Sequence, residues 1–107
     1  MTDGKFVSVM TNTFASEITY KEWKKKIEEF FFADERVIIL LKQNGMTKYT
    51  VYKTDDVEPV KSITIFEYST KDSFDKCQKI FLKFMPKIQD MIVKVNIVRG
   101  NTIFNKI

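Results

Sequence analysis

The stretch NGMTKYTVYKTDD, from Asn44 to Asp56, decides the fold of this chain. Its first two residues, Asn-Gly, are the strongest short signal for a β-hairpin turn, but Gly also commonly ends a helix in the left-handed conformation. The preceding ADERVIILLKQ has the β-branched run Val37–Ile39, which favours a strand, yet Ile38 and Leu41 continue a helical spacing that starts upstream. We expect residues 36–43 to form a helix that ends at Gly45, with a strand paired to residues 46–53 as the alternative.

The segments on either side of this stretch alternate between strand and helix patterns. A capping box at Thr19 and Glu22 opens a helix with apolar residues at helical spacing. Ser69, Thr70 and Asp72 are cap-forming residues that open a further helix, and Pro86 is expected to end it. The predicted strands are Phe6–Phe14, Met46–Thr54, Val60–Ser69 and Met91–Gly100, with a turn at residues 55–59.

The resulting order, β-α-(α)-β-β-α-β, predicts a ferredoxin-like fold of the α+β class. In this split βαβ arrangement, a four-stranded antiparallel sheet carries its helices on one face. A chain of 107 residues is long enough for one hydrophobic core, so we expect a single domain over residues 1–107.

The composition disfavours several classes of function. The sequence has no His and one Cys, which removes Ser-His-Asp and Cys-His catalysis, His-ligated zinc and an internal disulfide. We therefore expect no metal site and no cofactor. The net charge of +4 comes mostly from Lys, and Arg36 and Arg99 are the only arginines, so we expect no nucleic-acid partner. The sequence shows no signal region and no apolar run of membrane-spanning length, which predicts a cytoplasmic protein without a membrane partner.

The two faces of the predicted sheet differ in character, because alternate side chains of a strand point to opposite sides. One set is nearly all aliphatic and is expected under the helices: Val7, Val9, Tyr49, Val51, Ile63, Ile65, Val93, Val95 and Ile97. The other set mixes large rings with hydrogen-bonding groups: Phe6, Ser8, Met10, Asn12, Thr50, Tyr52, Thr64, Phe66, Tyr68, Lys94, Asn96 and Val98. Such a mixed face is too apolar for water, so we expect it to form a homodimer interface around a cavity.

GMTKYTVYKTDD followed by SITIFEYSTKDSFDK resembles the dimeric α/β-barrel superfamily, and in particular its antibiotic-biosynthesis-monooxygenase-like domains. The matching positions, within roughly residues 5–98, are Gly45, Tyr49, Val51, Tyr52, Glu67, Tyr68 and Phe74. The resemblance implies a homodimer that forms through the mixed face, with a cavity in each half. Some members oxidise polycyclic phenols without metal or flavin, and others degrade haem. The haem-degrading members carry an Asn on the first strand, a Trp at the end of the third and a His on the last helix. Here Asn12 matches, Tyr68 replaces the Trp and the His is missing, so we expect no haem chemistry.

The candidate ligand-binding residues belong to the mixed face: Met10, Asn12, Tyr52, Phe66, Tyr68 and Asn96. An Asn amide in a cavity can orient a substrate oxygen, and a Tyr can act as an acid, a base or a stacking group. Both residue types also serve structure alone, as interface hydrogen bonds or aromatic packing. Cys77 and Trp23 lie on apolar helical stripes, where a core position is the simpler expectation.

Two functions follow from these patterns. The first is a small homodimeric domain that binds an apolar or aromatic small molecule, with a cofactor-independent monooxygenase-like reaction as its catalytic form. The second is a non-enzymatic interaction protein whose sheet face only forms a dimer. The residues leave open whether the protein is an enzyme, and a ligand-sized cavity would favour the first function.

Overall fold

The structure is a computed structural model that describes residues 4–55 and 58–105. Residues 56 and 57, in the predicted turn at 55–59, lie outside the described residues. The strands are β1 (Phe6–Phe14), β2 (Met46–Lys53), β3 (Val60–Tyr68) and β4 (Lys94–Asn101). The helices are α1 (Glu17–Ile27), α2 (Glu35–Gln43), α3 (Lys71–Phe81) and α4 (Met85–Ile88), with a π-helical segment η1 (Glu28–Phe32) and a 3-10 turn η2 (Gln89–Met91).

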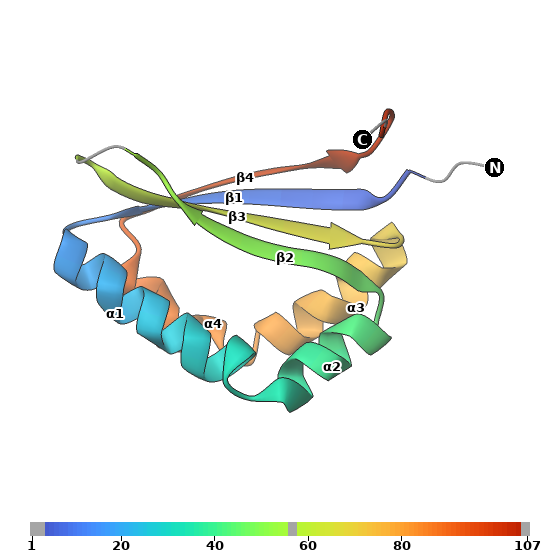
Figure 1. Cartoon of the computed structure of the whole chain (residues 1–107), viewed down its shortest axis with the longest axis horizontal. Helices are drawn as coiled ribbons and strands as arrows, with labels where there is room; N and C mark the ends of the chain where they lie inside the picture. The colour runs from blue at the N-terminus through green and yellow to red at the C-terminus, as the bar shows by residue number, and fades with distance from the viewer. Residues whose placement is uncertain (1–3, 56–57, 106–107) are drawn as a thin grey trace.

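The four strands form one antiparallel sheet in the order β2-β3-β1-β4, so β1 and β3 are central and β2 and β4 are edges. All four α-helices lie on the same face of this sheet (Figure 1). This architecture confirms the predicted ferredoxin-like fold with helices on one face.

The first helix, α1, begins earlier than the capping box predicted at Thr19 and Glu22. Ser16 is the N-cap of α1, and its hydroxyl accepts a hydrogen bond from the backbone N–H of Thr19 at 3.2 Å. Ser16 has the extended backbone that an N-cap requires, so Thr19 falls inside the first turn. After η1 the chain bends, and Asp34 caps α2 by accepting from the backbone N–H of Arg36 at 3.0 Å.

The helix predicted over residues 36–43 is confirmed: α2 ends at Gln43, with Asn44 as its C-cap, and Gly45 follows. Gly45 has φ of +101°, a conformation that costs other residues a steric penalty. Asn44 closes the last turn, because its side-chain amide donates to the carbonyl of Leu40 at 2.8 Å. The Gly45 carbonyl then accepts from the backbone N–H of Ser69 at 2.8 Å, which ties the start of β2 to the end of β3.

In the second half of the chain, Thr70 caps α3 by accepting from the backbone N–H of Ser73 at 3.1 Å. The expectation that Pro86 ends this helix is wrong. α3 ends at Phe81, and Pro86 lies in the first turn of α4, where its missing N–H costs no hydrogen bond. Because η2 occupies residues 89–91, β4 starts at Lys94 rather than at Met91.

The predicted assignment of sheet faces is wrong for β1 and β3. The side chains of these strands that point to the helices are the mixed set, together with Phe14 and Ser62 at the same alternation. Most of them are buried: Phe6, Ser8, Asn12, Phe14, Ser62, Thr64, Phe66 and Tyr68. The aliphatic Val7, Val9, Ile63 and Ile65 lie half-buried on the opposite face, which we call the open face. On β2 and β4 the expectation holds, because Tyr49 and Ile97 share the helix side with Phe66 and Met10. The large rings of β1 and β3 fill the space beneath the helices, and the small polar residues between them leave part of it unfilled.

Candidate ligand-binding cavity

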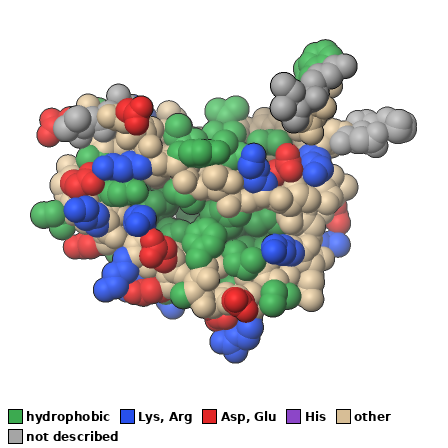
Figure 2. All heavy atoms as spheres, in the orientation of Figure 1, with side chains coloured by type: hydrophobic (Ala, Val, Ile, Leu, Met, Phe, Trp, Pro, Cys, Tyr) green, Lys and Arg blue, Asp and Glu red, His purple; other side chains and the backbone are tan. Residues whose placement is uncertain are grey.

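A cavity of about 130 Å³ lies between the sheet and the helical layer. Its walls come from all four strands and from α1, η1, α3, α4 and the residue after η2, and they are mostly aromatic and aliphatic. Figure 2 shows hydrophobic side chains gathered in the hollow between the sheet and the helices on the β2 side of the molecule. The cavity exists partly because Ser8 and Thr64 are small residues at positions where β1 and β3 face the helices.

One wall of the cavity is a cluster of aromatic rings from three layers of the fold. Phe66 of β3 lies 4.8 Å from Tyr49 of β2 and 5.2 Å from Phe81 of α3, measured between ring centroids. Phe31 of η1 packs 5.2 Å from Phe81 and closes the cluster from the helical side. Each contact is tilted or edge-to-face, an arrangement that aromatic rings prefer. Such a cluster forms a rigid apolar surface.

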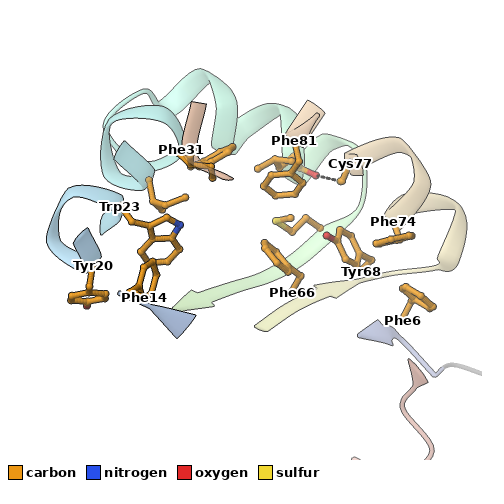
Figure 3. Packing of buried hydrophobic residues seen from close by; sticks show 14 of the residues in the cluster. Phe6, Phe14, Tyr20, Trp23, Phe31, Phe66, Tyr68, Phe74, Cys77 and Phe81 are labelled. Carbon is orange, nitrogen blue, oxygen red and sulfur yellow. Dashed lines mark hydrogen bonds between the residues drawn. The ribbon is translucent and has the colours of Figure 1, made fainter. Parts of the chain in front are cut away.

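Trp23 forms the opposite wall, and its polar group has no partner. The indole packs on Phe14 with ring centroids 5.1 Å apart and is 3% exposed. Its Nε1 is buried and makes no hydrogen bond. Figure 3 shows the indole nitrogen turned toward the space between Trp23 and Phe66, the space that the cavity occupies.

Asn12 on β1 presents a second unpartnered polar atom at the cavity. The side chain is 1% exposed and Oδ1 is buried without a hydrogen-bond donor. Most buried amides in proteins are hydrogen-bonded, because leaving one unpaired costs about 1–3 kcal/mol. Asn12 Oδ1 and Trp23 Nε1 are thus an acceptor and a donor without partners in the lining of one cavity.

Arg99 of β4 lies at the rim of the cavity, because it is exposed, as are the lining residues Leu82 and Ile97. Its Nε donates to the Ser8 hydroxyl at 3.4 Å, and its guanidinium carbon is 4.7 Å from the centroid of the Phe74 ring. Within residues 4–55 and 58–105, Arg99 forms no ion pair with a carboxylate. Among the residues that the structure describes, the lining of the cavity therefore has one cationic group, at its rim, and no acidic group.

Burial determines the protonation of the two tyrosines in the lining. It raises the pKa of Tyr49, and the nearby Tyr68 raises it further. Burial also raises the pKa of Tyr68. The nearby Cys77 raises this pKa further, and the positive charge of Arg99 lowers it in part. Both phenols are therefore neutral at physiological pH, and each can donate a hydrogen bond but cannot serve as a ready base.

Cys77 has the properties of a core thiol. It is fully buried on α3, and its Sγ lies 3.7 Å from the carbonyl oxygen of Leu41. Burial raises the pKa of the thiol, so the reactive thiolate is disfavoured. In the part of the chain that the structure describes, no three His, Cys, Asp or Glu side chains come together as a metal site would need.

The structure brings four of the six sequence-predicted site residues together. Met10, Asn12, Phe66 and Tyr68 all line the cavity, on the helix side of the sheet rather than at an interface between sheets. Tyr52 and Asn96 do not line it; they alternate with Tyr49 and Ile97 on β2 and β4 and so point to the open face. The sequence reasoning missed Trp23 and Arg99 as lining residues. Two signals could have found them. A buried Trp needs a hydrogen-bond acceptor for its indole N–H, and Arg99 is two residues from Ile97, so its side chain points to the same face of β4.

The chain matches no protein-family model, and no curated protein matches it in sequence. Its fold is shared with solved structures. A dimeric ferredoxin-like protein from an uncultured marine organism aligns over 98% of this chain and 93% of its own, with a TM-score of 0.89 and 23% identity. A second such marine protein aligns over 97% and 100%, with a TM-score of 0.83 and 15% identity. A Nitrosomonas europaea protein classed as an antibiotic biosynthesis monooxygenase covers 97% and 95%, with a TM-score of 0.75 and 9% identity.

These likenesses agree with the superfamily that the sequence resembles, and they establish the fold. None of the helices within residues 4–55 and 58–105 has the length and apolar character that crossing a bilayer requires.

Proposed function

We propose that the protein is a homodimeric domain that binds an apolar or aromatic small molecule in the cavity between its sheet and its helices. The observation that carries the proposal is the pair of unpartnered polar atoms, Asn12 Oδ1 and Trp23 Nε1, in a mostly apolar lining. Ligand sites are typically apolar cavities with a few such polar groups that fix the orientation of the ligand. A ligand hydroxyl group could donate to the amide and accept from the indole, which would remove both desolvation costs.

The catalytic form of this proposal is a cofactor-independent, monooxygenase-like reaction. It is supported by the fold shared with proteins classed as antibiotic biosynthesis monooxygenases and by Asn12 and Tyr68 in the cavity wall. In such a reaction a phenol supplies all four electrons to O₂, so that one oxygen atom enters the ring as a quinone oxygen and the other leaves as water. Tyr68, held as a neutral phenol, would donate a hydrogen bond to a developing oxyanion.

The homodimer is supported by the open face of the sheet. Five aliphatic side chains from three strands lie there, and no helix in the described part of the chain covers them: Val7, Val9, Ile63, Ile65 and Val98. A continuous apolar surface of this kind marks an interaction site. A second copy of the chain, related by a twofold axis, would place the same strip on both sides of the interface.

The test of ligand binding uses Trp23, the only Trp in the chain, as its reporter. We expect 4-ethylphenol, a neutral phenol with one ring, to shift the indole N–H resonance and the Trp fluorescence saturably. The variant Asn12→Leu should weaken this binding, because it removes the acceptor for the phenol hydroxyl. No change in either signal up to millimolar phenol would refute the binding function and favour the non-enzymatic interaction protein. Binding without oxygen uptake would refute only the catalytic form.

A further inference from the structure

We propose that the natural ligand is a single-ring aromatic acid, with its ring in the cavity, its carboxylate on Arg99 and a hydroxyl group at the opposite end. This inference rests on the proposed binding function and specifies its ligand class. It is argued from the size of the cavity, from its charge and from the separation of its polar groups.

The size of the cavity limits the ligand to about one ring. Its volume is about 130 Å³, whereas pockets for drug-sized molecules hold roughly 300–1,000 Å³. An engineered protein cavity of about 150 Å³ is known to hold benzene. The aromatic cluster of Phe31, Phe66 and Phe81 fixes the wall next to the cavity, so a fused polycycle does not fit without displacing packed rings.

The charge of the cavity calls for an anion at one end. Arg99 is the one charged residue in the lining, and it forms no ion pair among the described residues. Ser8 and the Phe74 ring hold the guanidinium in place, while only Nε is engaged by Ser8. The two terminal nitrogens are thus available for the paired hydrogen bonds that a carboxylate makes with Arg.

The separation of the polar groups calls for an elongated ligand. Ser8 and Asn12 point to the same side of β1 and are four residues apart, which places their Cα atoms about 13 Å apart at 3.3 Å per residue. Arg99 lies opposite Ser8 in the sheet, so the cation is at one end and the Asn12 amide is at the other. Between them lie Met10 and its partner Thr64, and Phe66 lies beside Ser8 at the cationic end. A hydroxyl group at the amide end both donates and accepts, as Asn12 Oδ1 and Trp23 Nε1 require.

The experiment compares an acid with its neutral analogue. 3-(4-Hydroxyphenyl)propanoate and the corresponding propanamide have nearly the same shape and differ in charge. We expect the acid to bind wild-type protein at least tenfold more tightly than the amide, read from Trp23 fluorescence and the indole resonance. In Arg99→Gln this preference should disappear, while the affinity for the amide stays unchanged. Arg99→Lys, which keeps the charge but not the paired donors, should retain part of the preference.

Lys94→Gln is the matched control, because it removes one positive charge from the same strand on the open face. It should leave the preference for the acid intact. Equal affinities for acid and amide in the wild type, or a preference that survives Arg99→Gln, would overturn the aromatic-acid assignment while the proposed binding function stands. If 4-ethylphenol, the amide and the acid all leave the Trp23 signals unchanged, the binding function itself fails.

Discussion

At the scale of single residues, Asn12 distinguishes a binding role from a structural one. A structural amide stabilises the fold through its hydrogen bonds, whereas Asn12 is buried with an unpaired oxygen. Replacing it with the nearly isosteric Leu removes a desolvated polar group, so we expect Asn12→Leu to raise the free energy of unfolding by about 1–2 kcal/mol. Urea denaturation measures this change. A loss of stability would show that the amide serves the fold.

Ser62 provides the control for this prediction. Its hydroxyl is also buried without a partner, on β3 directly opposite Asn12, but it does not line the cavity. Ser62→Ala should be neutral or slightly stabilising, and it should leave the affinity for 4-ethylphenol unchanged. Together the two variants separate the energetic cost of a buried polar atom from its use in binding a ligand.

At the scale of secondary-structure elements, the junction between α2 and β2 depends on Gly45. Its φ of +101° disfavours any other residue, and a Cβ there would meet the Ser73 hydroxyl at the start of α3. We expect Gly45→Ala to lower the free energy of unfolding by about 1–3 kcal/mol, as strained backbone positions usually cost. Gly100→Ala on β4 is the control, because a Cβ there meets no atom within 4 Å. Similar denaturation midpoints for the two variants would contradict this account.

The elements themselves could be predicted because their signals are local. Asn44-Gly45 marks the end of a helix, and Ser, Thr or Asp precedes each of the three longer helices as its N-cap. The faces of the sheet could not be predicted in the same way. Both sides of β1 and β3 carry apolar residues, so alternation alone does not tell which side the helices cover. Residue volume decides it, since Phe66 and Tyr68 fill a deep core whereas Val9 and Ile65 suit a flatter surface.

The same argument explains which site residues were found. Met10 and Asn12 on β1, like Phe66 and Tyr68 on β3, are an even number of positions apart, so strand alternation groups each pair correctly even when the face is wrong. Tyr52 was grouped with them incorrectly, because alternation within one strand does not fix which of its faces matches a face of the neighbouring strand. In the structure Tyr49 pairs with Phe66 and Tyr52 pairs with Ile63, after a register shift between Met46 and Lys48 that no local pattern reveals.

At the scale of the whole molecule, buried phenol and thiol groups make the free energy of unfolding depend on pH in the alkaline range. Burial raises the pKa of Tyr49, Tyr68 and Cys77, whose ordinary values are 10.0, 10.0 and 9.0. Below these values each group is protonated in both the folded and the unfolded chain. Above them the unfolded chain loses protons that the folded chain keeps, so the free energy of unfolding falls as the pH rises past about 9.

Urea midpoints measured between pH 7 and 10.5 should therefore be level at first and then decline. Tyr68→Phe removes one of the three groups, and its midpoint should decline less steeply than that of the wild type. Parallel curves for the two proteins would show that the Tyr68 hydroxyl is not protected from ionisation in the folded state.

The proposed homodimer is a property of the whole molecule, and it is tested at the open face, which none of the helices within the described residues covers (Figure 1). Ile65 pairs with Val9 across β3 and β1 at the centre of that face. In the proposed homodimer a glutamate at this position would bury two unpaired charges near the twofold axis, and that cost is large. We expect wild-type protein to sediment at twice 12.7 kDa and Ile65→Glu to sediment as a folded monomer with unchanged far-ultraviolet circular dichroism.

Two further variants make this result specific to the open face. Phe66→Glu changes the next residue of β3, but its side chain lies in the aromatic cluster under the helices, so it should unfold or aggregate rather than dissociate into folded monomers. Lys25→Glu alters the exposed surface of α1, away from the sheet, and should remain dimeric. A wild type that sediments as a monomer at micromolar concentration, or an Ile65→Glu variant that stays dimeric, would show that the aliphatic strip of the open face is not the surface through which two copies associate.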